Sequence, residues 1–298
     1  NVFQSGTDNC GTVNQVSVVP STFTCASPST NTVVLSVNDG HGNNATCNAT
    51  VTVVDLLPPT VVCKSYTATL NAAGQATITP ANVFQSGTDN CGTVNPASVS
   101  PNSFTCGNIG ANTVQLTVND GHGNNATCMA TVKVDDVTPP ALLCKPSVIL
   151  NLDASGNATL TVAQVNNGSS DNCGISTLSL SKTAFSCINI GANTVQLTGA
   201  DASGNTGSCT SVVTVQDVTQ PVAKCKNIIA NLGVNGTVTV APASVNNGST
   251  DNCSFNLTLL PATFNCGNIG VNTATLKATD AGGNSSTCTA TVTVKDMT

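Results

Sequence analysis

The chain lacks several residue types that most soluble proteins use freely. Among its 298 residues there is no Trp, Glu or Arg, aromatic residues account for 3% and charged residues for 7%, and the net charge is −6. Phosphate binding requires clustered Lys and Arg, so this composition argues against a nucleic-acid partner. No apolar run approaches the ~20 residues of a membrane-spanning helix, which argues against membrane insertion.

Cysteine, in contrast, is abundant. The 15 cysteines indicate an oxidising compartment, because cytosolic glutathione would keep so many thiols reduced. We therefore predict an extracellular protein at a cell surface. Val and Thr dominate short segments that Asn, Gly and Pro interrupt, which is typical of an all-β chain with almost no helix.

The cysteines also mark an internal repeat of roughly 80 residues, and such self-similarity indicates a tandem architecture. The marker is an Asp-Asn-Cys motif that ends at Cys10, Cys91, Cys173 and Cys253. We predict a partial repeat that lacks its first strand, followed by three complete ones, at 1–55, 56–136, 137–217 and 218–298. We expect the missing strand upstream in a longer chain; donation of a strand by another chain is the alternative.

Strand patterns within a repeat predict the fold class. The segment "ATCMATVKVDD" places Cys128, Ala130, Val132 and Val134 on one face, which is the alternation of a half-buried strand. About seven such strands in ~80 residues predict an immunoglobulin-like sandwich. We expect an all-β chain of tandem immunoglobulin-like β-sandwich domains in an elongated array, with an antiparallel barrel as the alternative.

Disulfides should matter in such domains, because ~80 residues with few aromatic side chains bury a thin core. Four cysteines per repeat allow three pairings. We predict that the second pairs with the third, since the loop between them varies in length as a stapled loop can, and that the first pairs with the fourth. The predicted bonds are Cys10–Cys25, Cys91–Cys106, Cys173–Cys187, Cys253–Cys266, Cys63–Cys128, Cys144–Cys209 and Cys225–Cys288.

Cys47 is left over in this scheme, because its partner would lie upstream of residue 1. A zinc site with four cysteine ligands is the alternative use of these thiols. It is disfavoured, because such sites use close Cys-x-x-Cys pairs and the sequence has none.

The loop "VNDGHGNNATC" occurs twice, at 37–47 and 118–128. A phosphate cradle requires a helix after the glycines, and here a strand follows. His41 and His122 are replaced in the later repeats, which read "ADASGNTGSC" and "TDAGGNSSTC". We therefore predict that both histidines are exposed loop residues and that the chain is not an enzyme and has no catalytic residues.

The aspartates recur at three places in each repeat: before Asn-Cys, in the Gly-containing loop, and ahead of the linker. In an immunoglobulin-like topology the first two places share the pole at which the chain enters from the preceding domain. Three carboxylates with nearby carbonyl oxygens suit Ca²⁺. The predicted structural Ca²⁺ sites are Asp55, Asp89 and Asp120; Asp136, Asp171 and Asp201; and Asp217, Asp251 and Asp280, with Asp8 and Asp39 lacking a linker partner. The alternative is that each Asp only caps its own turn.

The motifs "D-x-x-P-P…C", "D-N-C", "F-x-C" and "V-x-L-x-V-x-D-x-x-G-N…C-x-A-x-V-x-V-x-D" together resemble the hyalin repeat (HYR) family, especially its cysteine-rich form in giant surface adhesins of Bacteroidota. The resemblance covers the three complete repeats and the partial one. It implies an immunoglobulin-like fold, a role in adhesion within very long exported chains, and no catalytic residues. The chain departs from many members by having no Trp, and from several by having two cysteine pairs per repeat instead of the outer pair alone.

Together these observations predict an extracellular structural and adhesive segment that forms a stiff cell-surface stalk or filament, stapled by disulfides and made rigid by Ca²⁺ at the domain junctions. Its expected partners are neighbouring repeats of the same long chain, copies of itself in a fibre, and an extracellular surface or polysaccharide. An array of carbohydrate-binding modules is the alternative. Sugar platforms generally use exposed Trp or Tyr, and the chain offers only Tyr66.

Overall fold

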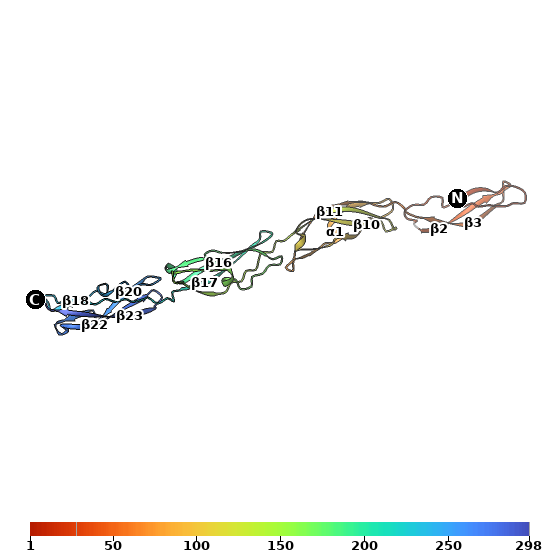
Figure 1. Cartoon of the computed structure of the whole chain (residues 1–298). Coiled ribbons are helices and arrows are strands. Elements are labelled where there is room, and N and C mark those ends of the chain that lie inside the picture. The colour runs from red at the N-terminus through yellow and green to blue at the C-terminus, as the bar shows by residue number, and fades with distance from the viewer. Residues whose placement is uncertain (28, 298) are drawn as a thin grey trace. The chain divides into compact units, whose positions relative to one another are not determined.

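The computed structural model describes residues 1–27 and 29–297 (Figure 1). The chain divides into two compact units, Asn1–Thr138 and Pro139–Thr298. Both units consist mainly of β-strands. The described α-helices are single turns, α1 (Pro80–Val83), α2 (Val162–Val165) and α3 (Pro242–Val245). Among the described residues, no helix has the length and apolar character needed to span a bilayer.

The first unit contains a three-stranded sheet, a four-stranded sheet and two short strand pairs. The three-stranded sheet has the order β1-β2-β3, formed by Asn14–Val19, Ser29–Asn38 and Asn44–Val53. The four-stranded sheet has the order β5-β11-β10-β8, formed by Tyr66–Thr69, Asn125–Asp135, Gly110–Asn119 and Asn95–Ser100. The short pairs join β4 (Thr60–Cys63) to β7 (Phe84–Thr88) and β6 (Gln75–Thr77) to β9 (Ser103–Thr105).

The second unit contains two four-stranded sheets, each accompanied by one short strand pair. One sheet has the order β12-β17-β16-β14, formed by Ser147–Asn151, Thr206–Gln216, Gly191–Asp201 and Ile175–Leu180. The other has the order β18-β23-β22-β20, formed by Ile228–Asn231, Ser285–Lys295, Gly270–Asp280 and Phe255–Leu260. The facing strand pairs are β13 (Asn157–Thr159) with β15 (Ala184–Ser186) and β19 (Thr237–Thr239) with β21 (Thr263–Asn265).

Strand pairing in each four-stranded sheet is that of an immunoglobulin-like sandwich. The first strand lies parallel to the last, as β12 does to β17, while the other neighbours are antiparallel. Parallel neighbours need a crossover connection, which here runs through the facing strand pair. Phe264 from β21 packs in one core with Leu276 and Val292 from the opposite sheet. The all-β immunoglobulin-like architecture predicted from the sequence is confirmed.

The predicted alternation also holds along β11. Ala130, Val132 and Val134 are buried, whereas Met129 is 61% exposed. Burying one such Val contributes about 1.5–3 kcal/mol to folding, so a one-residue slip of this strand would expose its whole apolar face.

Within the complete repeats, the first cysteine bonds to the fourth, as the sequence predicted. These disulfides tie the opening segment of each repeat to its last strand. They are Cys63–Cys128, Cys144–Cys209 and Cys225–Cys288.

The predicted pairing of the second cysteine with the third is wrong. Instead, the third cysteine of one repeat bonds to the second cysteine of the following repeat, in Cys25–Cys91 and Cys187–Cys253. Three cysteines, among them the expected leftover, are free and exposed: Cys10, Cys47 and Cys266. The bonds thereby excluded are Cys10–Cys25, Cys91–Cys106, Cys173–Cys187 and Cys253–Cys266.

Strand direction explains why the prediction failed. Ile175, two residues after Cys173, pairs with Asp201 at the end of β16, whereas Cys187 precedes the start of β16 at Gly191. An 11-residue strand spans about 36 Å at ~3.3 Å per residue. A disulfide requires Cα atoms within about 7 Å, so these two cysteines lie at opposite poles of one domain and cannot bond.

Peptide mapping of the unreduced protein should recover the fragments that contain Cys25 with Cys91 and Cys187 with Cys253. Alkylation under denaturing, non-reducing conditions should label Cys10, Cys47 and Cys266 and no other cysteine, because the remaining twelve are bonded. A recovered Cys173–Cys187 peptide, or alkylation of any further cysteine, would contradict the structure.

Candidate metal centre

The Gly-containing loop holds its aspartate through an asparagine four residues later. In the last repeat, the Asn284 backbone N–H donates to Asp280 Oδ1 at 2.7 Å and the Asn284 side chain donates to Oδ2 at 2.9 Å. The Asp280 backbone N–H donates in turn to the Asn284 carbonyl at 3.0 Å. The loops of Asp39, Asp120 and Asp201 are closed in the same way. These aspartates therefore cap their own turns, and the capping bonds fix where each carboxylate lies.

In the second unit, three carboxylates from distant parts of the sequence converge. Asp217 follows β17, Asp251 precedes β20, and Asp280 ends β22. Each contributes an oxygen, and these oxygens lie within 4.8 Å of one another. Asp217 and Asp280 are buried, with exposed fractions of 4% and 6%. The structure thus brings together one predicted group, Asp217 with Asp251 and Asp280, which we call the acidic triad.

Two oxygens of the acidic triad lack a hydrogen-bond partner although they are buried: Asp217 Oδ2 and Asp251 Oδ1. Their sister oxygens accept bonds from the backbone, Asp217 Oδ1 from Thr219 at 3.1 Å and Asp251 Oδ2 from Cys253 at 3.1 Å. A buried, unpaired carboxylate oxygen costs free energy unless a cation or donor reaches it. Within residues 139–297, no lysine is recorded in an ion pair with the triad.

Charge repulsion within the triad affects Asp251 directly. Burial is the largest effect and raises the pKa of Asp251, and the neighbouring charges of Asp217 and Asp280 raise it further, against the backbone hydrogen bond from Cys253. The pKa of Asp201 moves the other way: burial raises it, but hydrogen bonds led by that of Asn205 outweigh this and leave it lowered. The triad is therefore a place where negative charge is under-compensated.

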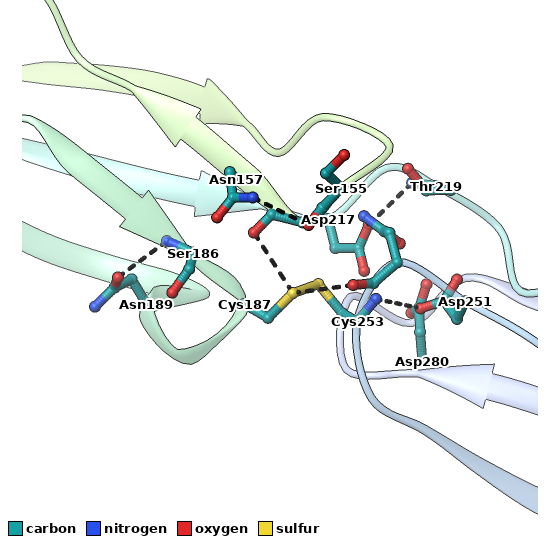
Figure 2. The surroundings of a disulfide bond; sticks show 12 residues. Ser155, Asn157, Ser186, Cys187, Asn189, Asp217, Thr219, Asp251, Cys253 and Asp280 are labelled. Carbon is teal, nitrogen blue, oxygen red and sulfur yellow. Dashed lines mark hydrogen bonds between the residues drawn. A yellow bond between two sulfur atoms is a disulfide. The ribbon is translucent and has the colours of Figure 1, made fainter.

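The disulfide between consecutive repeats positions the triad (Figure 2). Cys253, two residues after Asp251, is bonded to Cys187 of the preceding repeat. Between them in sequence, the Asn252 side chain donates to the Asp153 carbonyl at 3.1 Å and to Asp217 Oδ1 at 3.2 Å. The loop that carries Asp251 is thus held against the repeat that supplies Asp217.

Close approach at this disulfide requires Gly156, which has φ +74°. A Cβ there would lie 2.6 Å from Cys187 Sγ and 2.8 Å from the Asn252 carbonyl oxygen. We expect Gly156→Ala to destabilise the second unit by roughly 1–3 kcal/mol, through left-handed backbone strain and steric clash. Chemical denaturation measures the change.

Gly168→Ala is the matched control, because Gly168 has φ +85° but nothing within 4 Å of its added Cβ. It should cost only the backbone term of about 1 kcal/mol. Equal losses for the two variants would show that the 153–156 turn does not press on the disulfide.

The first unit brings together a different set from the predicted one. Asp55, Asp120 and His122 group within 4.8 Å, and His122 Nδ1 lies 4.0 Å from Asp55 Oδ2. Asp89, predicted as the third member, is outside this group, although its Oδ1 is buried and unpaired. His122 is exposed, as the sequence predicted, but comparison of the repeats did not predict its place beside Asp55. The pKa of Asp120 is lowered: burial raises it, but hydrogen bonds from Asn124 and His122 dominate.

The remaining predicted ligands are not brought together as a complete group within either unit. Asp8 accepts a bond from the Cys10 backbone and Asp39 from its own loop, and neither belongs to a group of ligands among the described residues. The hydrogen bond from Asn43 is the main cause of the lowered pKa of Asp39. The predicted group of Asp136, Asp171 and Asp201 draws on both units, which are placed independently, so it stays a prediction.

The acidic triad has the chemistry of a site for a hard divalent cation. Ca²⁺ takes six to eight oxygen ligands in flexible geometry. The triad offers three carboxylates, and the unpaired, buried Asn252 Oδ1 lies beside them in sequence. Soft or tetrahedral metals are a poor match, because no thiolate or imidazole belongs to this group.

One segment of the chain matches a known protein family. Residues 135–215 match the HYR domain family. This HYR domain contains β12 to β17 and the Cys144–Cys209 disulfide. It supplies Cys187 to the bond with the following repeat.

Two curated proteins are similar to a larger part of the chain. Hyalin from Strongylocentrotus purpuratus is 31% identical over 245 residues, which cover 77% of this chain and 20% of that protein. Hyalin from Lytechinus variegatus is 28% identical over 265 residues, covering 83% and 48%. The chain therefore spans a fifth of the first relative and about half of the second.

The solved structures that this chain resembles have low sequence identity and low TM-scores. Titin domains I67–I69 have a TM-score of 0.38 at 13% identity, covering 81% of this chain and 100% of that one. Immunoglobulin domains 1–5 of Sidekick-1 have a TM-score of 0.36 at 10% identity, covering 92% and 68%. The extracellular domain of protocadherin gamma B4 has a TM-score of 0.32 at 15% identity, covering 89% and 54%.

Proposed function

We propose that this chain is a segment of an extracellular structural and adhesive protein, built throughout from HYR repeats, that forms a stiff cell-surface stalk or filament with Ca²⁺ at its repeat junctions. The HYR match of residues 135–215 and the similarity to hyalin support the repeat assignment. The disulfides support an oxidising, extracellular setting. The proposal also includes kinship with Bacteroidota adhesins, adhesion to an extracellular surface or polysaccharide, and association of copies into a fibre.

A single observation carries the cation part of the proposal. Asp217 Oδ2 and Asp251 Oδ1 are buried without a partner inside a group of three carboxylates. A divalent cation would supply the missing partner and neutralise the repulsion that raises the pKa of Asp251. Because Asp217 belongs to one repeat and Asp251 to the next, the bound ion would also restrain the joint between them.

Calorimetric titration of the full chain with Ca²⁺ tests this. We expect saturable binding in the 10⁻⁴–10⁻³ M range of extracellular Ca²⁺ modules, with weaker binding of Mg²⁺, which resists dehydration. Asp217→Asn should weaken the site in the second unit at least tenfold, because it removes the charge of a buried ligand.

Asp153→Asn is the matched control for that substitution. The Asp153 side chain only caps its own turn, accepting from Ser155 and Asn157, and the second repeat has Asn71 at the corresponding place. Its Ca²⁺ affinity should equal that of the unaltered chain. Absence of Ca²⁺ binding up to 10⁻² M, or equal losses in both variants, would refute the cation site.

A further inference from the structure

Consecutive repeats are connected at two places along the covalent structure, not one. In the second unit, the first connection is the chain from Cys209, which lies in β17, through the linker to Cys225. The second is the Cys187–Cys253 disulfide, whose partners are 66 residues apart in sequence. Cys25–Cys91 makes the same kind of connection in the first unit, also across 66 residues. The arrangement therefore recurs and does not depend on one unusual cysteine.

Disulfides within the repeats complete a short covalent route. Cys144–Cys209 and Cys225–Cys288 bridge sequence separations of 65 and 63 residues. A pulling force that enters at Cys144 crosses to Cys209, follows the linker to Cys225 and crosses to Cys288. The residues enclosed by each bridge lie outside this route and are not stretched.

We infer that this chain is a tension-bearing element of fixed length, in which force passes from repeat to repeat through the linker and the inter-repeat disulfide in parallel, while most of each repeat is shielded from force. The observation is the disulfide connectivity, and the inference holds with or without bound cation. An immunoglobulin-like domain without such bridges lengthens when force unravels it. Here, unravelling a domain would release little length.

The maximum end-to-end length under force follows from the reach of an extended chain, about 3.5 Å per residue. One short route from end to end uses Cys25–Cys91, Cys144–Cys209 and Cys225–Cys288. It leaves about 100 residues of the 298 to be stretched, which corresponds to about 370 Å. The reduced chain would reach about 1,000 Å.

Single-molecule pulling of the full chain from its two ends tests the shielding. We expect the oxidised chain to stop lengthening near roughly 370 Å and the chain in reductant to reach roughly 1,000 Å. Cys225→Ala/Cys288→Ala together with Cys187→Ala/Cys253→Ala should lengthen the oxidised limit by about 210 Å, since 63 residues enter the route. An oxidised chain that extends as far as the reduced one would overturn the inference.

Cutting the linker tests the second connection. A protease site introduced between Asp217 and Cys225 is cleaved while the molecule is held under low force. We expect the tether to survive cleavage, because Cys187–Cys253 still joins the two repeats, and to break when reductant is added. In Cys187→Ala/Cys253→Ala, cleavage alone should break the tether.

Outcomes of the linker experiment separate this inference from the proposed function. Loss of the tether on cleavage of the unaltered chain, without reductant, would show that the linker alone carries force and would overturn the inference. Repeating the cleavage in chelator should give the same survival, because the disulfide needs no cation. Failure of Ca²⁺ binding would therefore leave this result unchanged, so the two failures are distinguishable.

Discussion

Replacing Asp251 with Asn should change the melting temperature of the second unit in opposite directions with and without Ca²⁺. In chelator, burial and the charges of Asp217 and Asp280 raise the pKa of Asp251, so the charged form of this side chain is disfavoured in the folded state. Removing the charge should therefore stabilise the unit. An Asn oxygen also keeps the acceptor that the Cys253 backbone uses.

With Ca²⁺ bound, the same substitution removes an anionic ligand. Ligand binding stabilises the folded state by about 2.7 kcal/mol at a concentration of 100 Kd, and Asp251→Asn should lose much of this. We expect the melting temperature to rise by a few degrees in chelator and to fall by several degrees in saturating Ca²⁺. A change of 1 kcal/mol shifts the melting temperature of a domain of ~80 residues by about 4–8 °C. Differential scanning calorimetry in the two buffers measures both.

Asp153→Asn serves again as the control and should shift the melting temperature equally in the two buffers. A shift of the same sign for Asp251→Asn in both conditions would show that the triad does not bind Ca²⁺. If Asp251→Asn stabilised the unit in chelator and Ca²⁺ made no difference, the carboxylates would repel one another without forming a Ca²⁺ site.

Removing the Cys187–Cys253 disulfide should weaken Ca²⁺ binding at the triad at least tenfold and leave each domain folded. This bond fixes the loop that carries Asp251 against the repeat that supplies Asp217. Without it, Ca²⁺ binding must order the joint, and that ordering reduces the net affinity. Calorimetric titration of Cys187→Ala/Cys253→Ala gives the affinity, and circular dichroism gives the melting temperature.

The disulfide within the third repeat provides the contrasting control. Cys144→Ala/Cys209→Ala opens a bridge across 65 residues inside one domain, which should cost about 2–5 kcal/mol of stability. Below its melting temperature this variant should bind Ca²⁺ at the triad with unchanged affinity, because neither cysteine holds the Asp251 loop. Equal loss of affinity in both variants would mean that general destabilisation, not the joint, determines binding.

The candidate site could be predicted only in part. That Asp217, Asp251 and Asp280 would meet followed from their recurrence and from the pole that their loops share in an immunoglobulin-like topology. That His122 would stand with Asp55 and Asp120, leaving Asp89 outside, did not follow, because a repeat comparison records which residues recur and not where a ring lies. Gly282, at the place of His122 in the last repeat, shows the difference: a Cβ there would lie 2.5 Å from the Asp217 carbonyl oxygen.

The sequence by itself determined the repeat period, the alternation that buries Val132 and Val134, and the pairing of the first cysteine with the fourth. These depend on local side-chain period and on the opening and closing segments of one domain. Only the tertiary structure decided that Cys187 reaches Cys253 and not Cys173. Strand β16 separates the two ends of a domain by more than a disulfide can span, and a residue's pole depends on strand direction, which spacing along the chain does not encode.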